Sequence, residues 1–391
     1  MELSSTFTFR STQTLISPIN NPFNHHQLPF STKLKTKSNR TTSLTVSAKK
    51  TTSIEGVSDE LNGIASFNLD FAYTRRRVRE AFAQVQLQLD HCLFKNAPAG
   101  IRTEEWYERN WRGLEIFCKS WLPESGVPIK ASVCFCHGYG DTCTFFFEGI
   151  ARRIAASGYA VYAMDYPGFG LSEGLHGYIP NFDDLVYDVI DHYTKVKARP
   201  EVKGLPRFIM GQSMGGAVTL KVHLEESDNW DGVVLVAPMC KIADEVLPPD
   251  PVMKVLTVLS NVIPKAKLFP NQDLAELTFS EPSKRKLAVY NVISYGDNPR
   301  LKTGMELIRA TKEIESQVHK VYAPLLIMHG AEDKVTDPLT SRFLYEKASS
   351  KDKTLKLYDG GYHGILEGET DERIFAIHDD IVSWLDSRVK K

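Results

Sequence analysis

Short apolar runs alternate with helical stretches along most of this chain, and this alternation restricts the folds open to it. The runs are rich in small and β-branched apolar residues and occupy positions 131–136, 160–164, 207–211, 233–236 and 325–328. Strands that are apolar on both faces are typical of parallel sheets covered by helices on both sides. Two further strand-like runs, 106–110 and 114–121, flank a turn at Arg112-Gly113. The sequence therefore predicts an α/β fold with a mostly parallel sheet and helices on both faces.

The alternation fails between residues 238 and 323, where the sequence is Pro-rich and helical in pattern. We interpret residues 241–318 as a helical cap inserted over the sheet, and residues 100–240 and 319–391 as the sheet-containing core. Residues 49–99 are expected to form an N-terminal extension. Within it, residues 70–95 are charged and carry apolar positions at helical spacing, which predicts an amphipathic helix.

Composition narrows the class of protein. The chain has 391 residues and a formal net charge of −1, from 47 basic and 48 acidic residues. A nucleic-acid binder needs a basic footprint, which this balance does not provide. The six Cys show no CxxC pair, which argues against a disulfide scaffold or a zinc ribbon. No apolar run reaches the roughly 18 residues of a membrane span. We expect a soluble enzyme or small-molecule binder.

The first 48 residues differ from the rest. They contain seventeen Ser or Thr, five Lys or Arg and one acid, Glu2. This acid-poor, hydroxyl-rich composition is typical of an organelle transit peptide. The small residues Val46-Ser47-Ala48 resemble a stromal processing site, and the segment has only two Arg, which favours plastid over mitochondrial import. We predict a disordered transit peptide at residues 1–48 and a chloroplast location. The alternative is a disordered tail that carries no targeting signal.

A nucleophile is predicted at Ser213. It lies in Gly211-Gln212-Ser213-Met214-Gly215, a G-x-S-x-G pattern that follows an apolar run and precedes a helical stretch. In such a strand–turn–helix the two Gly permit a sharp turn that exposes the Ser hydroxyl beside the helix N-terminus. A chance Gly-rich turn would have no catalytic partners at useful positions.

A serine nucleophile needs a base, and the base needs an orienting carboxylate. Asp333 follows the apolar run at 325–328, and His363 follows the next strand-like run. Both positions are at the carboxyl ends of predicted strands, where open α/β sheets keep their sites. Glu332 and Asp337 are neighbouring acids that compete with Asp333. Among the 11 His, only His363 has this placement.

An oxyanion hole is predicted beside Ser213. Such a hole takes one N–H from the residue after the nucleophile, here Met214, and one from the loop after an earlier strand. The run 131–136 ends in His137-Gly138-Tyr139-Gly140, so Tyr139 would supply the second N–H. His137 has no task as a base once His363 is placed, and we expect it to shape the loop.

These motifs together resemble the serine α/β-hydrolases, and more narrowly the plant monoacylglycerol lipase-like family. That family includes lysophospholipase-like and caffeoylshikimate-esterase-like members. The resemblance spans about residues 100–388 and is carried by TEEWY at 103–107, HGYG at 137–140, DYPGFGLS at 165–172, the Ser213 pentapeptide and KTLKLY at 353–358. By the family pattern, Ser213, Asp333 and His363 are the catalytic triad, and Tyr139 and Met214 supply the oxyanion N–H groups.

One position departs from the family pattern. Animal members carry a Cys three residues after the triad Asp, where this chain has Thr336. Thiol-directed inhibition at this position is therefore not expected to carry over to this chain.

The resemblance implies a serine hydrolase of lipid esters, either a monoacylglycerol lipase or a lysophospholipase, with no metal or organic cofactor. A phenolic ester hydrolase of the caffeoylshikimate esterase type shares every catalytic residue named above. A non-catalytic small-molecule receptor on the same fold is a third hypothesis. Partners are expected to be a small-molecule ester or lipid, without nucleic acid. The apolar helical stripe at 252–263 would line an acyl tunnel, contact a membrane surface or pack on the core.

Overall fold

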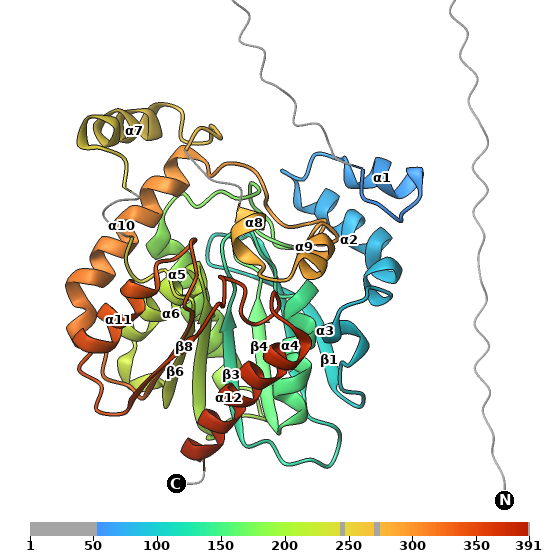
Figure 1. The fold of residues 1–391 in the computed structure, drawn as a ribbon, viewed down its shortest axis with the longest axis vertical. Coiled ribbons are helices and arrows are strands. Elements are labelled where there is room, and N and C mark those ends of the chain that lie inside the picture. Colours follow the sequence, from blue (N-terminus) through green and yellow to red (C-terminus); the bar gives the residue numbers. More distant parts are fainter. Residues whose placement is uncertain (1–52, 243–246, 270–273, 390–391) are drawn as a thin grey trace, which may run out of the picture. The chain divides into compact units, whose positions relative to one another are not determined.

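The computed structural model of the chain describes residues 53–242, 247–269 and 274–389 (Figure 1). The predicted transit peptide at 1–48 lies outside the described residues. The N-terminal extension contains α1 (Asp59–Ala65), α2 (Ala72–Leu87) and α3 (Cys92–Lys95). The helical pattern within 70–95 corresponds to α2 followed by the short α3, and α2 buries Val78 and Phe82 in the core.

In the described part of the chain, eight strands form a single sheet in the order β1-β2-β4-β3-β5-β6-β7-β8. The strands are β1 (Arg102–Arg109), β2 (Glu115–Leu122), β3 (Ala131–Cys136), β4 (Tyr159–Met164), β5 (Arg207–Gln212), β6 (Gly232–Val236), β7 (Leu325–Gly330) and β8 (Lys353–Tyr358). The pairs β1–β2 and β2–β4 are antiparallel, and every other neighbouring pair is parallel. The predicted α/β fold with a mostly parallel sheet is confirmed.

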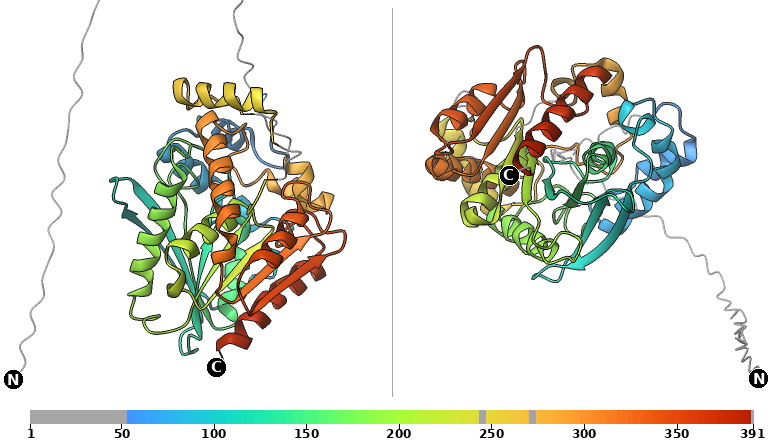
Figure 2. Two further views of the ribbon diagram at one scale, coloured as in Figure 1. Left: turned by 90° about the vertical axis from the view of Figure 1, so that its left-hand side faces the viewer. Right: turned by 90° about the horizontal axis from the view of Figure 1, so that it is seen from below.

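Side chains alternate between two core clusters because successive residues of a strand point to opposite faces of the sheet. On β3, Cys134 and Cys136 enter one cluster, whereas Val133 and Phe135 enter the other. The first cluster is closed by α5 (Phe182–Lys197), α6 (Met214–Glu225), α10 (Leu301–Gln317) and α11 (Pro338–Lys347). The second is closed by α2, α4 (Phe145–Ala156) and α12 (Asp371–Val389). Helices therefore cover both faces of the sheet (Figure 2).

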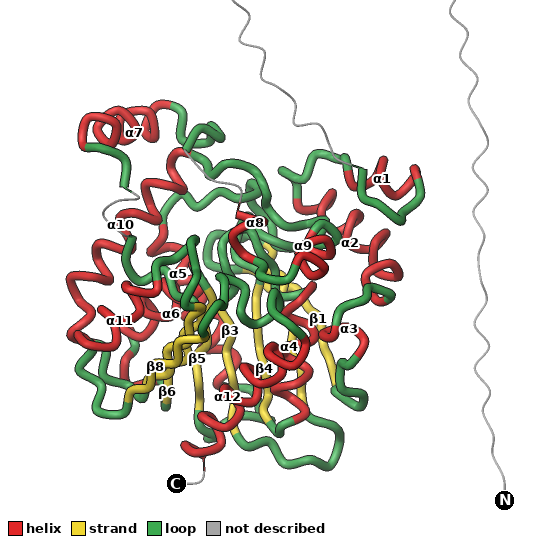
Figure 3. The backbone as a smooth tube through the Cα atoms, in the orientation of Figure 1, coloured by secondary structure: helices red, strands yellow, loops and turns green. Residues whose placement is uncertain are grey.

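Local sequence signals set where these helices begin. Asn181 caps α5 by accepting hydrogen bonds from the backbone N–H groups of Asp183 and Asp184, which satisfies donors that have no partner within the helix. Asp337 caps α11 in the same way, and Pro338 occupies its first position. Figure 3 shows the resulting layers, with the strands lying among the helices.

Between β6 and β7 the described residues form four α-helices: α7 (Asp250–Val262), α8 (Leu274–Thr278), α9 (Pro282–Ala288) and α10. Ala310 and Ile314 of α10 belong to the core cluster under the sheet, so the second half of this helix covers the sheet directly. In contrast, α7 contacts α10 and extends away from the sheet (Figure 1). The boundaries of the cap at 241 and 318 stay predictions. None of the helices in the described ranges has both the length and the apolarity that crossing a membrane requires.

Candidate active site

Ser213 occupies a strained turn between β5 and α6. Its backbone has φ 55° and ψ −122°, a region that residues with a side chain seldom adopt. Both flanking glycines are needed: a Cβ at Gly211 would lie 2.2 Å from the Gly215 carbonyl oxygen, and one at Gly215 would lie 1.9 Å from the Cys136 carbonyl oxygen. The turn therefore packs against β3 with no room for side chains at these two positions.

The structure brings Ser213, His363 and Asp333 together in a hydrogen-bonded chain. The Ser213 hydroxyl donates to His363 Nε2 at 2.9 Å, and His363 Nδ1 donates to Asp333 Oδ2 at 2.7 Å. The Asp333 side chain has no exposed surface, and that of His363 is 8% exposed. This is the arrangement in which an imidazole can accept the proton of an attacking hydroxyl while a carboxylate fixes its tautomer.

The Asp333 carboxylate is held in its ionised form. Burial acts to raise its pKa, but attraction to His363 and hydrogen bonds from His329 and His363 outweigh burial and leave the pKa below its ordinary value. Its other oxygen accepts the backbone N–H groups of Val335 at 2.7 Å and Thr336 at 3.1 Å. A carboxylate with this many donors remains an acceptor for His363 across the physiological pH range.

The neighbouring acids do not compete for His363 in this geometry. Asp337 caps α11 through the Leu339 N–H at 2.8 Å, and Glu332 is exposed. Thr336, the position of the family departure, lies inside the network: its hydroxyl is 2.9 Å from Asp333 Oδ2 and 3.1 Å from His363 Nδ1.

The two residues predicted to supply oxyanion N–H groups flank the nucleophile. Met214 is the first residue of α6, so its N–H is one of those without an acceptor inside the helix. Tyr139 follows Gly138, where an added Cβ would lie 3.4 Å from Ser213 Cβ. The loop after β3 therefore runs directly past the nucleophile.

Two histidines outside the triad bond to backbone groups. The His137 Nδ1–H donates to the Gly138 carbonyl oxygen at 2.8 Å, and its Nε2 accepts the Tyr166 N–H at 3.2 Å. His137 therefore shapes the loop after β3, as expected. His223 accepts the Tyr322 N–H at 3.4 Å.

His329, for which no motif predicts a role, bonds the same Asp333 oxygen as His363. Its Nε2 donates to Asp333 Oδ2 at 2.9 Å, and its Nδ1 accepts from the Ser341 hydroxyl at 2.7 Å. The spacing of four residues between His329 and the acid is the only signal the sequence offers for this contact.

Glu367 was also missed. This buried carboxyl group accepts from the side chain of Gln212, the residue before the nucleophile, at 3.0 Å. Burial, with a smaller effect of the nearby Asp141, raises the pKa of Glu367 to about 8. The group is therefore mainly protonated at neutral pH, and it adds no full negative charge next to the nucleophile turn.

In this site a strained turn with the serine joins a central parallel strand to a helix, and a buried Asp–His pair faces the serine hydroxyl. This is the geometry of serine hydrolases of the α/β-hydrolase fold. Comparisons with known proteins agree with this class. The family model described as serine aminopeptidase, S33, matches residues 127–371. On this match, the chain belongs to the S33 serine aminopeptidase family of α/β-hydrolases, together with monoglyceride lipases and caffeoylshikimate esterase.

Individual relatives come from both of these groups. Caffeoylshikimate esterase of Arabidopsis thaliana is 34% identical over 293 residues, covering 75% of this chain and 88% of the relative. Human monoglyceride lipase is 31% identical over 283 residues, covering 71% of this chain and 89% of the relative. A soluble variant of monoglyceride lipase from Saccharomyces cerevisiae, solved with a substrate analogue, superposes with a TM-score of 0.61 at 23% identity and covers 73% of this chain and 95% of that one. This last likeness concerns the fold.

Proposed function

We propose that this serine hydrolase cleaves the carboxylic ester of monoacyl lipids, either monoacylglycerols or lysophospholipids. The hydrogen-bonded chain of Ser213, His363 and Asp333 supports acyl transfer, and the relatives named caffeoylshikimate esterase and monoglyceride lipase support an ester as the substrate. The choice of a lipid rests on one observation, an apolar face that α7 presents to solvent. Relatives named monoglyceride lipase support the same choice.

In the proposed mechanism the Ser213 oxygen attacks the ester carbonyl carbon while His363 Nε2 takes the hydroxyl proton. The N–H groups of Tyr139 and Met214 stabilise the oxyanion. His363 then gives its proton to the leaving alcohol, and the acyl group stays on Ser213. A water molecule, deprotonated by His363, attacks the acyl-enzyme, and the fatty acid leaves as Ser213 regains its proton.

The apolar face of α7 and the residues after it carries side chains that are unusually exposed for their type. Their exposed fractions are Val252 44%, Val255 57%, Val258 62%, Val262 70%, Ile263 41% and Leu268 60%. Exposed apolar groups gathered on one helix mark contact surfaces rather than ordinary solvated faces. Exposed lysines lie in the same stretch, at 254 and 265, whereas the exposed Lys267 pairs with Asp297 at 2.7 Å. An apolar face accompanied by lysines suits the surface of a membrane or lipid aggregate that carries anionic head groups.

We therefore propose that α7 brings the enzyme into transient contact with the lipid surface that holds its substrate. Leu256 and Ser260 lie on the buried side of the helix, so the apolar stripe seen in the sequence divides into a packed side and an exposed side.

A second candidate function is hydrolysis of a phenolic ester. The observation that favours it is the 34% identity with caffeoylshikimate esterase of Arabidopsis thaliana. Every catalytic residue proposed above would serve this reaction as well, so substrate measurements must separate the two.

A panel of monoacylglycerols, lysophospholipids and caffeoylshikimate, assayed with the purified chain and with Ser213→Ala, tests both candidates. We expect a higher kcat/KM for the monoacyl lipids, and loss of turnover in Ser213→Ala to the roughly 10³–10⁴-fold rate enhancement that the oxyanion hole and binding alone provide. A fluorophosphonate probe should label the wild type and not this variant. Preference for caffeoylshikimate would establish the second candidate, and absence of turnover on all three classes would contradict both.

A further inference from the structure

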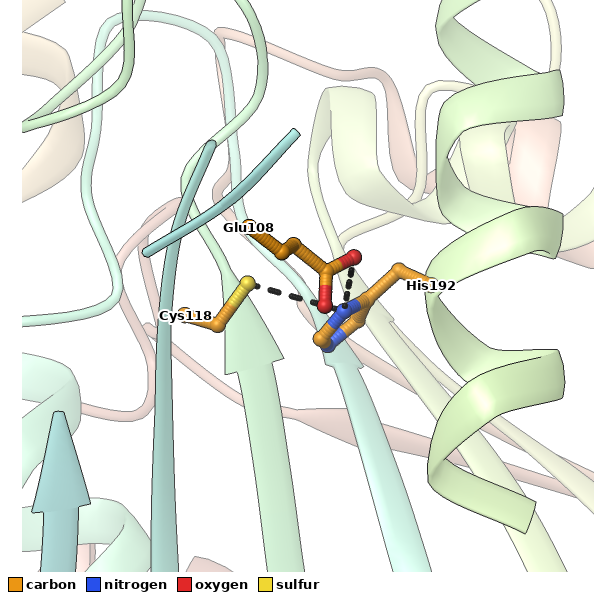
Figure 4. Close-up of side chains that lie close together, drawn as sticks. All are labelled: Glu108, Cys118 and His192. Atoms are coloured by element: carbon orange, nitrogen blue, oxygen red, sulfur yellow. Dashed lines mark hydrogen bonds and ion pairs between the residues drawn. The ribbon is translucent and has the colours of Figure 1, made fainter. Parts of the chain in front are cut away.

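Three potential metal ligands converge at the edge of the sheet formed by β1 and β2. Glu108 lies on β1, Cys118 on β2 and His192 on α5, and their side chains point toward one another (Figure 4). The ligand atoms of all three lie within 4.8 Å of one another. Within the described ranges this is the one group of three or more His, Cys, Asp or Glu so arranged.

The register of the hairpin explains the convergence. Trp106 pairs with Cys118, and Glu108 pairs with Ile116, so Glu108 and Cys118 are diagonal neighbours. Because residues two apart on a strand share a face, both side chains point to the face that α5 covers. His192 is on the buried side of α5, directly above them.

The distances within the cluster fit a zinc ion. His192 Nδ1 is 3.5 Å from Cys118 Sγ and 3.1 Å from Glu108 Oε1. Zinc binds sulfur at about 2.3 Å, imidazole nitrogen at about 2.0–2.1 Å and carboxylate oxygen at about 2.0–2.2 Å, with tetrahedral geometry. Those bond lengths put the sulfur and nitrogen about 3.5 Å apart, and the nitrogen and oxygen about 3.4 Å apart. Shifts of a few tenths of an ångström in the ligand atoms would let the three side chains bind the ion.

The surroundings suit a bound cation with one open position. The side chain of Cys118 is fully buried and that of His192 is 1% exposed, whereas that of Glu108 is 20% exposed. The Cys118 and His192 side of the site is therefore shielded from solvent. The Glu108 side reaches solvent, and there a water molecule can complete the coordination. Lys195, 3.4 Å from Glu108 Oε1, also pairs with Asp191 at 2.7 Å, so it keeps a partner when Glu108 turns to a metal.

We propose that Glu108 Oε1, Cys118 Sγ and His192 Nδ1 bind a Zn²⁺ ion, with water as the fourth ligand. The Cys118 thiol must lose its proton to bind, and this proton, with any proton on His192 Nδ1, leaves to solvent. The thiolate and the carboxylate then balance the two positive charges of the ion. The site ties the β1–β2 hairpin to α5.

This zinc site is independent of ester hydrolysis. Its strands form one edge of the sheet, whereas Asp333 and His363 follow β7 and β8 at the opposite edge. Neither the proposed mechanism nor the proposed substrate depends on it.

Cobalt titration of the full chain, without an affinity tag, reduced and stripped with a chelator, tests the proposal. We expect one equivalent of Co²⁺ to bind, with the near-ultraviolet charge-transfer band of a thiolate–cobalt bond, and Zn²⁺ to displace it. Cys118→Ala should lose the band, and because it removes a ligand it should weaken Co²⁺ binding by more than the roughly 10–100-fold that loss of a residue supporting a ligand costs. The matched control is Cys134→Ala, which removes another buried thiol of the same sheet and should keep the band.

Glu108→Gln tests the carboxylate with little change of shape. It should weaken Co²⁺ binding while the protein keeps its turnover of a short soluble ester, which shows that the variant is folded. Failure of the wild type to take up one equivalent of Co²⁺ or Zn²⁺ would overturn the proposal without reference to any variant. A thiolate band that persists in Cys118→Ala would overturn it as well.

Discussion

Asp333 lies between two imidazoles, and this position explains how the candidate base is held. His363 and His329 both donate to Asp333 Oδ2, at 2.7 Å and 2.9 Å. His329 is in turn fixed by Ser341 and is completely buried. The carboxylate therefore cannot rotate without breaking several hydrogen bonds, and the orientation of His363 follows from it.

The carboxylate assignment gives the first prediction. Asp333→Asn should lower kcat by roughly 10⁴, because an amide favours the wrong imidazole tautomer. The matched control is Asp337→Asn. The hydrogen bond seen for the Asp337 side chain is the one that caps α11, and Asn remains a good helix cap. Rates on a short soluble ester measure both variants. A large loss in Asp337→Asn with little change in Asp333→Asn would show that the wrong acid was chosen.

Glu367 gives a prediction for stability against pH. Its pKa of about 8 in the folded chain exceeds the value of about 4.3 for an unfolded Glu. Between these values the folded state binds more protons than the unfolded state, so the contribution of Glu367 to the free energy of unfolding falls as pH rises. Glu367→Gln, which stays neutral, should show a weaker fall between about pH 5 and pH 8.

Urea unfolding of the wild type and Glu367→Gln at several pH values measures this difference. Glu332→Gln, an exposed acid in the loop after β7, is the control and should retain the wild-type pH dependence. Identical slopes in the wild type and Glu367→Gln would contradict a protonated Glu367.

The sequence revealed Ser213, Asp333 and His363 because each lies at or within a few residues of the end of a strand-like run, and the carboxyl ends of such strands meet at one edge of a sheet. His329 and Thr336 gave no comparable signal. Their contacts with Asp333 depend on the path of the loop after β7, which no periodicity in the sequence encodes. Glu367 was missed for a related reason, since its hydrogen bond with Gln212 joins two residues far apart in the sequence.

At the scale of elements, α2 is joined to the core through a buried arginine. The Arg75 guanidinium donates to the backbone carbonyl oxygens of Gly170 at 2.6 Å, Leu69 at 2.7 Å and Ser172 at 2.5 Å. Gly170 and Ser172 belong to the DYPGFGLS segment, whose Asp165 carboxylate accepts the Cys143 N–H at 2.7 Å. The N-terminal extension is thereby linked to the loops around the candidate site.

Arg75→Met should lower the free energy of unfolding by at least about 3 kcal/mol, because it leaves buried carbonyl oxygens without donors. Arg77→Met is the control: this arginine is two residues away on the same helix and is exposed, so we expect a change within about 0.5 kcal/mol. The measurement is a urea unfolding curve for each variant. Equal stabilities would mean that α2 contributes little to the fold.

The exposed side of α7 gives a prediction about substrate presentation. Val255→Ser combined with Val258→Ser should reduce activity on monoacylglycerol held in anionic vesicles by about tenfold, since less apolar area is buried at the lipid surface. Activity on a short soluble ester should not change. Val289→Ser, which alters another exposed valine (55% exposed), is the control. Equal losses on both substrates would contradict a role in surface contact.

The helical period of α7 was visible in the sequence, but its orientation was not. An apolar stripe has the same pattern whether it packs on the core or meets a membrane. Only the contact with α10 shows that Leu256 faces inward and Val255 faces solvent. The strands were easier to predict, because a short run that is apolar at every position suits a central strand buried on both faces and suits an amphipathic helix poorly.

At the scale of the whole molecule, the described chain from residue 53 onward already contains the complete sheet and every candidate catalytic residue. Residues 1–48 are therefore not needed to build the site, and their composition indicates a different task. This segment holds seventeen Ser or Thr, five Lys or Arg and a single acidic residue. Such a composition favours recognition by the plastid import machinery. We infer that this segment is removed after import and that the enzyme acts in the chloroplast.

Fusion of residues 1–48 to a fluorescent reporter tests this inference in isolated chloroplasts. We expect the reporter to become protease-protected and shortened to a product that begins near Lys49. Replacing Ser4, Ser5, Lys33 and Lys35 with Glu should abolish import, because acidic residues remove the charge pattern of a transit peptide; the same number of Ser→Thr changes should preserve it. Import into isolated mitochondria but not into chloroplasts would make the segment a mitochondrial targeting peptide. Import into neither organelle would identify a tail without a targeting signal.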